Sequence, residues 1–258
     1  MTGHAIQWSR SLIFNLQMYL AMAVLALVFL PWALISRHGA FTACHAYCAW
    51  VLWTARWMIG LKTEIRGVPP TDEVVIAAKH QSFLDILVIF HAVPQARFIM
   101  KRSLLFTPVL GQYARRIGCV PVNRLKGGQA IRRMMRDVTA ARRHPGQLVI
   151  YPQGTRIAPG AHLPYKSGIS ALYTHLGQDC VPVATNAGVF WPRRSVYRGP
   201  GTAVVEFLPR IPKGMARSAF IKTLETNIET ASDRLLLETG FQKRGARLIG
   251  TNPKSRAG

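Results

Sequence analysis

The sequence predicts an α/β fold in which a central, mostly parallel β-sheet is flanked by helices and preceded by a membrane-anchoring helical segment. From residue 74 onward, short runs rich in β-branched residues alternate with helical stretches, which is typical of α/β domains. The preceding residues are mainly apolar and include a run of 26 residues without a formal charge. We therefore expect one or two anchoring helices over residues 1–62, an α/β domain over 63–240 and a basic, flexible tail over 241–258.

The composition indicates an anionic partner and narrows the possible chemistry. The 258 residues contain 33 Lys and Arg against 11 Asp and Glu, a formal net charge of +22. Such a charge favours phosphate groups, an acidic membrane surface or nucleic acid as partners. Between Ile86 and Gln178 the only acid is Asp137. A glycosidase site needs a facing pair of carboxylates and a two-metal site usually needs several, so the general base of this section is expected to be a histidine.

The N-terminal apolar run predicts an anchoring helix. Residues Ser11 to Ser36 carry no formal charge, Arg10 and Arg37 flank them, and Pro31 is the only helix breaker. A membrane-spanning helix needs about 20 apolar residues, whereas a cleaved signal peptide has a shorter apolar core and a small-residue cleavage site. We expect an uncleaved anchor, with a buried core helix as the alternative.

A second stretch, Ala40 to Leu61, is rich in aromatic residues. Trp50, Trp53 and Trp57 are spaced i, i+3, i+7 and so fall on one helical face. Tryptophan favours the membrane interface. This spacing indicates an interfacial or re-entrant helix, and a helix packed on the α/β domain is the equally weighted alternative.

The α/β domain is expected to contain six strands and five helices. The expected strands are Val74–Ala78, Ala96–Met100, Gly118–Val122, Gln147–Tyr151, Val181–Thr185 and Ala203–Phe207. The expected helices are Ser82–Ala92, Leu104–Arg115, Gly128–Arg143, Gly168–Leu176 and Arg217–Glu238. Lys243 to Gly258 contains five basic residues and no acid, which predicts a loose tail that touches anionic lipid.

One candidate catalytic cluster directly follows the first expected strand. Ser82 and Asp85 have the spacing of a capping box, which predicts that a helix begins at Ser82. Side chains in a first helical turn point back toward the N-terminus, so Asp85 should lean toward His80. A carboxylate that accepts one imidazole N–H leaves the other ring nitrogen available as a base. On this spacing alone, a plain cap with a loop histidine remains the alternative.

A candidate anion-binding cluster, Tyr151-Pro152-Gln153-Gly154-Thr155-Arg156, follows the fourth expected strand. Ligand sites of α/β folds lie at the carboxyl ends of strands. Gly154 permits close backbone approach, while Thr155 and Arg156 offer a hydroxyl and a forked cation that suit phosphate. Lys166 follows as a further cation. A plain strand-exit turn is the alternative.

Four short sequence motifs occur in an order that resembles a known family. His80-x4-Asp85, Pro121-Val122-Asn123-Arg124, Tyr151-Pro152-Gln153-Gly154-Thr155-Arg156 and Val181-Pro182-Val183-Ala184 follow one another, with Met100-Lys101-Arg102-Ser103-Leu104-Leu105 between the first two. Over about residues 74–208 the chain resembles the glycerolipid acyltransferase family of the HxxxxD type, in particular bacterial 1-acyl-sn-glycerol-3-phosphate acyltransferases.

The resemblance implies roles for individual residues. His80 is the expected general base and Asp85 its orienting partner. The substrate-binding residues that it implies are Arg124, Gly154, Thr155, Arg156, Lys101 and Lys166. The family usually has Glu where this chain has Gln153, and often Asp where it has Asn123, so two negative charges of the family pattern are missing.

The resemblance also implies a reaction and partners. An acyl group would pass from acyl-CoA or acyl carrier protein to the sn-2 hydroxyl of lysophosphatidic acid, without a metal or redox cofactor. The enzyme would lie at the inner (cytoplasmic) membrane with its catalytic domain on the cytoplasmic face. A sibling acyltransferase for another lysolipid or glycerol 3-phosphate is one alternative. A non-catalytic basic protein that binds membrane or nucleic acid is the other, and it leaves the His80–Asp85 pair unexplained; no specific nucleic acid is expected.

Overall fold

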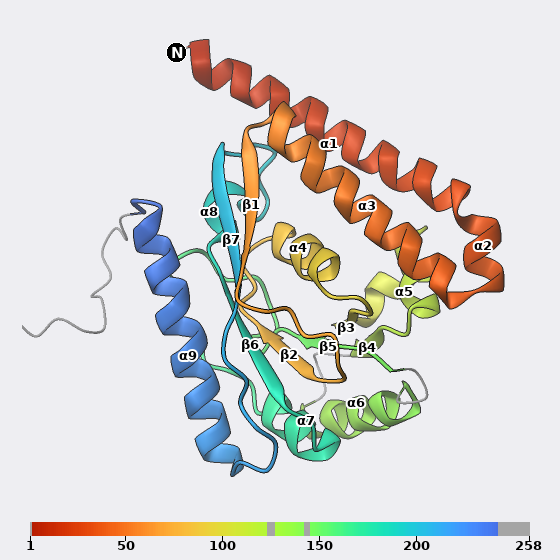
Figure 1. The fold of residues 1–258 in the computed structure, drawn as a ribbon, viewed down its shortest axis with the longest axis vertical. Helices are drawn as coiled ribbons and strands as arrows, with labels where there is room; N and C mark the ends of the chain where they lie inside the picture. Colours follow the sequence, from red (N-terminus) through yellow and green to blue (C-terminus); the bar gives the residue numbers. More distant parts are fainter. Residues whose placement is uncertain (1, 123–126, 142–144, 242–258) are drawn as a thin grey trace, which may run out of the picture.

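A seven-stranded β-sheet forms the centre of the protein (Figure 1). The computed structural model describes residues 2–122, 127–141 and 145–241. The strand order is β1-β7-β6-β2-β5-β3-β4, and every neighbouring pair is parallel except β6 and β7. The strands are β1 (Leu61–Arg66), β2 (Val75–Ala78), β3 (Arg97–Lys101), β4 (Val120–Val122), β5 (Leu148–Ile150), β6 (Cys180–Thr185) and β7 (Gly201–Phe207). The expected α/β class with a mostly parallel sheet is confirmed.

Helices cover both faces of the sheet because its strands alternate their side chains between two cores. Ile76 of β2 belongs to the core formed with the N-terminal helices and α4, whereas Val75 and Ala77 belong to the core formed with α6, α7 and α9. Figure 1 shows α9 on one face and α4 with α3 on the other. The helices of the domain are α4 (Leu84–Ala92), the 3-10 helix η1 (Arg102–Phe106), α5 (Leu110–Arg116), α6 (Gly127–Ala141), α7 (Gly168–Leu176), α8 (Ala187–Phe190) and α9 (Arg217–Glu238).

The N-terminal residues form three helices, of which two lie side by side (Figure 1). They are α1 (Thr2–Val28), α2 (Leu30–Ile35) and α3 (Arg37–Met58). The apolar run is interrupted at Pro31, which lies in the first turn of α2, where its missing N–H costs nothing. Residues 3–28 form the one helix of the described chain that is long and apolar enough to cross a membrane, and little of it is buried.

Helix α1 also bears polar side chains that fix it to the domain. Gln7 donates to the carbonyls of Ile59 and Arg198, and Asn15 donates to the carbonyl of Val196. The Ser11 hydroxyl accepts a hydrogen bond from the backbone N–H of Arg198 at 3.0 Å. These contacts attach α1 to the segment before β7.

The structure differs from the expectations at several boundaries. Strand β1, which no sequence pattern predicted, pairs in parallel with β7. The expected boundary at residue 62 therefore falls within β1, and the division of the chain into three parts stays a prediction. The stretch expected as one helix from Leu104 is divided into η1 and α5, because Pro108 cannot donate a backbone hydrogen bond. The basic tail from residue 242 lies outside the described residues.

Candidate active site

Two adjacent parallel strands bring the two candidate clusters together. Strands β2 and β5 pair in register, with Ala77 opposite Ile150. The segments that leave their carboxyl ends, the His80 loop (residues 79–83) and the Arg156 loop (residues 151–167), therefore start side by side. The backbone N–H of Ile157 donates to the His80 carbonyl at 2.7 Å and joins the loops.

His80 and Asp85 form a hydrogen-bonded pair. The distance from His80 Nδ1 to Asp85 Oδ1 is 2.9 Å, and Asp85 is completely buried. Asp85 Oδ2 accepts hydrogen bonds from the backbone N–H groups of Gln81 and Ser82, at 2.8 and 2.7 Å. The carboxylate thus reaches back over the start of α4 as in a capping box, although the helix begins at Leu84 rather than at Ser82. Nδ1 of His80 is bonded to Asp85, and Nε2 has no hydrogen-bond partner among the described residues. Nε2 is therefore free to act as a base and accept a proton.

Tyr151 supports this pair from the neighbouring strand. Its ring stacks on the imidazole of His80, with centroids 3.9 Å apart and planes inclined by 18°. Its hydroxyl donates to Asp85 Oδ1 at 3.3 Å. Burial, and then the negative charge of Asp85, raise the pKa of Tyr151 well above its ordinary value. The phenol therefore stays protonated and can donate to the carboxylate at neutral pH.

The Arg156 loop turns sharply at Gly154, whose φ of +72° favours glycine. Lys166 lies over this glycine with its exposed side chain. The hydroxyl of Thr155 and the carbonyl of Arg156 accept hydrogen bonds from Arg193, at 3.5 and 3.3 Å. Four of the residues expected to bind substrate, Gly154, Thr155, Arg156 and Lys166, thus lie in one loop.

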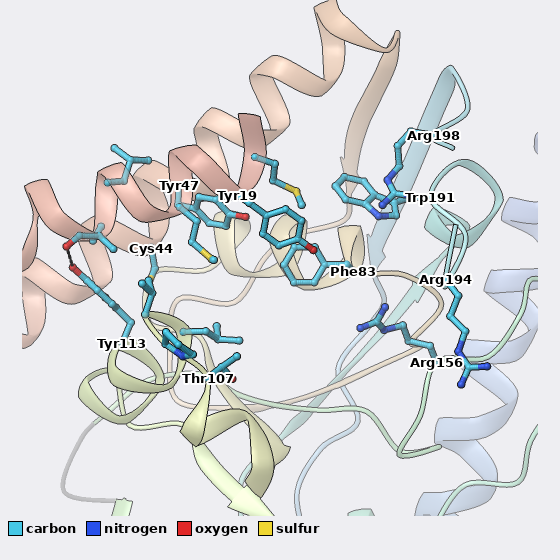
Figure 2. A pocket seen from close by; sticks show the side chains of 18 of the residues that line it. Tyr19, Cys44, Tyr47, Phe83, Thr107, Tyr113, Arg156, Trp191, Arg194 and Arg198 are labelled. Atoms are coloured by element: carbon cyan, nitrogen blue, oxygen red, sulfur yellow. Dashed lines mark hydrogen bonds between the residues drawn. The ribbon is translucent and has the colours of Figure 1, made fainter. Parts of the chain in front are cut away.

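A cavity of about 480 Å³ opens beside these loops, between the N-terminal helices and the α/β domain. Figure 2 shows Tyr19 and Tyr47 toward one side of it and Arg156 and Arg194 toward the other. Most of its lining is apolar, and the apolar side chains from α1, α3 and α5 are Met18, Met22, Leu25, Ala26, Ala43 and Leu110. The cavity therefore offers an apolar compartment continuous with a cationic one, which suits an amphipathic anion.

Arg198 is the buried cation of this cavity. Its guanidinium lies 4.5 Å from the centre of the Trp191 ring and donates to Asn15 Oδ1 at 3.0 Å. It forms no ion pair with a carboxylate of the described residues. Burial lowers the pKa of Arg198 to about 10, so the side chain remains charged at neutral pH.

Two cavity residues have positive φ angles without being glycine. Val109 and Arg194 each have a φ of +63°. This region is unfavourable for side chains with a Cβ, above all for β-branched ones. Strained residues of this kind cluster at ligand sites, which agrees with a site at this cavity.

Of the remaining expected residues, Lys101 does not join this cluster. Lys101 is exposed at the end of β3, and no hydrogen bond or ion pair among the described residues connects its side chain to the His80 or Arg156 loops. Arg124 lies outside the described residues. The described residues contain no group of three or more His, Cys, Asp or Glu side chains that could hold a metal ion.

Sequence reasoning missed several residues of the site. Tyr151 lies within the candidate anion-binding cluster, but the sequence alone assigns it no role, because its contact with His80 depends on the pairing of β2 and β5. Trp191 and Arg198 lie after β6 and reach the cavity only through the docking of α1. A signal for that docking exists, since Gln7, Ser11 and Asn15 recur at i, i+4 and i+8 on one helical face.

Comparisons with known proteins agree with this architecture. Residues 62–186 match the Acyltransferase family model. The chain is 27% identical over 165 residues to the 1-acyl-sn-glycerol-3-phosphate acyltransferase of Pseudomonas aeruginosa, which covers 63% of this chain and 64% of the relative. It is 28% identical over 194 residues to human 1-acyl-sn-glycerol-3-phosphate acyltransferase beta, covering 73% of this chain and 70% of the relative. The match with the Pseudomonas protein thus spans less than two thirds of that protein's length.

A solved structure has the same fold. The crystal structure of the 1-acyl-sn-glycerophosphate acyltransferase PlsC from Thermotoga maritima superposes with a TM-score of 0.74 and 18% sequence identity, covering 92% of this chain and all of that one. Residues 62–186, which match the family model, contain both the His80 and the Arg156 loops. Residues 62–186 are thus similar in sequence to the acyltransferase family, and the chain shares its fold with PlsC.

Proposed function

We propose that this protein transfers a fatty acyl group from a thioester donor to the sn-2 hydroxyl of lysophosphatidic acid. The observation that carries the proposal is the His80–Asp85 pair, 2.9 Å apart, beside a cavity that is apolar on one side and lined by arginines on the other. A lysophospholipid has the same two parts, an acyl chain and an anionic head group. The names of the relatives point to the same acceptor.

His80 would act as the general base. Its Nε2 takes the proton of the acceptor hydroxyl while Nδ1–H remains bonded to Asp85. The hydroxyl oxygen attacks the thioester carbonyl, an oxygen–carbon bond forms and the carbon–sulfur bond breaks. The protonated His80 then returns its proton to the leaving thiolate. Asp85 stabilises the transient imidazolium, as the carboxylates of catalytic triads do.

The Arg156 loop would bind the phosphate of the acceptor. Arg156 lines the cavity and offers a forked set of donors for phosphate oxygens. Gly154, Thr155 and Lys166 of the same loop are proposed as its partners, and Lys101 and Arg124 as further substrate-binding cations. The apolar residues of α1 and α3 would receive an acyl chain.

The donor is proposed to be acyl-CoA or acyl carrier protein, both of which are strongly anionic and suit the net charge of +22. No metal or redox cofactor takes part in this proposal. The neutral Gln153 favours one further candidate, a sibling enzyme that acylates another lysolipid or glycerol 3-phosphate.

The N-terminal helices would attach the enzyme to the inner membrane, with the catalytic domain on the cytoplasmic face. Trp50, Trp53 and Trp57 of α3 are 44%, 57% and 62% exposed, as an interfacial helix requires. Exposed apolar side chains continue along α1 and α2, and Leu16 and Ile35 are 72% and 84% exposed. Polar contacts fix α1 to the α/β domain. We therefore propose that the helices enter the membrane and hold the attached domain against an anionic lipid surface.

An acyl-transfer assay with purified full-length protein tests the proposal. Lysophosphatidic acid, other lysolipids and glycerol 3-phosphate are compared as acceptors, with acyl-CoA and acyl carrier protein as donors. We expect transfer to lysophosphatidic acid and a loss of about 10²- to 10⁴-fold in kcat for His80→Ala. His175→Ala, which removes an exposed histidine that contacts Thr139, is the control. Activity of His80→Ala within a few-fold of the parent would contradict the role of His80, and preference for another acceptor would move the function to a sibling reaction.

A further inference from the structure

A charged residue of the last helix lies between the two loops of the site. Glu229 of α9 pairs with Lys79, at 2.6 and 2.7 Å from Lys79 Nζ to its two carboxylate oxygens. Glu229 Oε1 also accepts a hydrogen bond from the Tyr165 hydroxyl at 2.8 Å and lies 3.5 Å from Gln153 Nε2. Lys79 directly precedes His80, and Gln153 directly precedes Gly154. The Glu229 carboxylate thus contacts both Lys79, which precedes His80, and Gln153, which precedes Gly154.

Lys79, Gln153 and Glu229 form a cluster that is largely buried, so the number of charges in it affects its stability. Lys79 is 2% exposed and Gln153 is 1% exposed. A buried cation loses its hydration, so a carboxylate paired with it stabilises it. Glu229 is the only carboxylate of the described chain that forms an ion pair with Lys79. The cluster therefore holds one cation, one anion and one neutral amide.

Gln153 is oriented by the same contacts. Its Nε2 donates to the Leu163 carbonyl at 3.2 Å and faces Glu229, while its Oε1 is buried without a hydrogen-bond partner. A glutamate at position 153 would have almost the same shape, but would bring a second carboxylate close to Glu229. Since the cluster contains one lysine, two carboxylates there would repel each other.

We propose that Glu229 is a positioning residue of the active site, which fixes the His80 and Arg156 loops relative to each other through Lys79 and Gln153. The inference rests on the proposed acyl transfer. It adds that the site needs one carboxylate at this point, and that α9, which lies beyond the matched family segment, supplies it. Position 153 can hold a neutral amide because Glu229 of α9 already provides the negative charge.

Moving the carboxylate from the helix to the loop tests the proposal. The variants are Glu229→Gln, Gln153→Glu and the double variant, which keeps the number of charges and exchanges their places. Glu238→Gln is the matched control, since Glu238 also lies on α9 and pairs with Arg66 at 2.7 Å and Arg234 at 3.2 Å, neither of which belongs to the two loops. The measurements are kcat, KM for lysophosphatidic acid, the thermal unfolding midpoint, and the rate of His80 carbethoxylation by diethyl pyrocarbonate, resolved by mass spectrometry.

We expect each single variant to lose about 10- to 100-fold in kcat, the size of effect that a small misplacement of catalytic groups produces. KM for lysophosphatidic acid rises and carbethoxylation of His80 becomes faster, because both loops loosen. The double variant regains most of the lost turnover and the original carbethoxylation rate. Glu238→Gln resembles the parent in kcat, KM and carbethoxylation rate.

Two results would overturn the inference. The first is a double variant as impaired as either single variant. The second is a Glu229→Gln variant with a lower unfolding midpoint but unchanged kcat and carbethoxylation rate, which would make Glu229 a tether of α9 only. A parent protein without acyl transfer would refute the proposed function instead, and the carbethoxylation rates of the four proteins would then decide the positioning role by themselves.

Discussion

The side chain of Lys166 lies across Gly154, with its Nζ 3.1 Å from the point that a Cβ atom on Gly154 would occupy. The turn at Gly154 has a φ of +72°, so an added side chain meets both an unfavourable backbone conformation and a neighbouring cation. The two effects can be separated, because Gly177 has a similar φ of +60° and open space around it.

Replacing each of these glycines by alanine should therefore give different results. We expect Gly154→Ala and Gly177→Ala each to lower the free energy of unfolding by roughly 1–2 kcal/mol, the cost of a left-handed conformation for an L-residue. Only Gly154→Ala should also raise KM for lysophosphatidic acid, because it displaces Lys166. Denaturant unfolding and steady-state kinetics measure the two effects, and an equal KM in both variants would remove Lys166 from the acceptor site.

The stacked Tyr151 provides a second prediction. Tyr151→Phe keeps the ring on His80 and removes only the hydroxyl that donates to Asp85, a bond worth about 1 kcal/mol, so kcat should fall a few-fold. Tyr151→Ala removes the stacked ring as well and should cost more. Tyr173→Phe is the control, since it removes a buried hydroxyl bonded to the Pro212 carbonyl, remote from the site. A Tyr151→Phe variant with the kcat of the parent would mean that the 3.3 Å contact contributes nothing to catalysis.

Arg156 should distinguish the acceptor from the donor. Arg156→Lys keeps the positive charge but loses the two-pronged geometry that matches phosphate. We expect KM for lysophosphatidic acid to rise about tenfold or more, as for the loss of a charged hydrogen bond, with little change in KM for the donor. Arg132→Lys, at an exposed position of α6, serves as the control. An equal effect on both substrates would place Arg156 outside the acceptor subsite.

The membrane attachment should have an apolar and an electrostatic part. Leu16, Leu20 and Leu27 of α1 are 72%, 63% and 70% exposed. Their joint replacement by Gln leaves the net charge unchanged, and we expect it to abolish binding to vesicles at high salt while binding to anionic vesicles at low salt persists. The reason is that salt screens exposed charges over about 10 Å at 0.1 M but does not weaken apolar burial.

Sedimentation with vesicles of neutral and anionic lipid across a salt series measures this effect. Leu237→Gln is the control, because Leu237 is an equally exposed leucine, 60% accessible, on α9. Release of the parent protein at high salt would show that the exposed leucines of α1 do not enter the membrane.

The sheet and the central pair were predictable because their signals are local. Each of the six expected strands has its own β-branched run, and the capping-box spacing alone brought Asp85 toward His80. Strand β1 was missed because Leu61–Arg66 alternates charged with apolar residues only weakly, and its place is fixed by pairing with β7 far along the chain. Non-local contacts of this kind leave no pattern within a short window.

The same limit applies to the cavity and to Glu229. Arg198 and Glu229 belong to segments without a recognisable motif, and both become part of the site only when α1 and α9 dock. The tryptophans of α3 could be placed on one exposed face by helical spacing. That the same helix also packs against α4 through its other face depended on tertiary packing.

The docking of α1 has a consequence for the order of folding. The partners Ser11 and Arg198 lie 187 residues apart in the sequence, which the ribosome at 5–20 residues per second synthesises in about 10–40 s. During that interval α1, α3 and β1 exist without β7, the strand that completes the sheet beside β1. A nascent chain with apolar helices and an uncovered strand edge is prone to aggregate. Early insertion of α1 and α3 into the lipid surface would keep their apolar side chains from aggregating until the C-terminal half emerges. The bilayer would then assist folding before it serves as the site of catalysis.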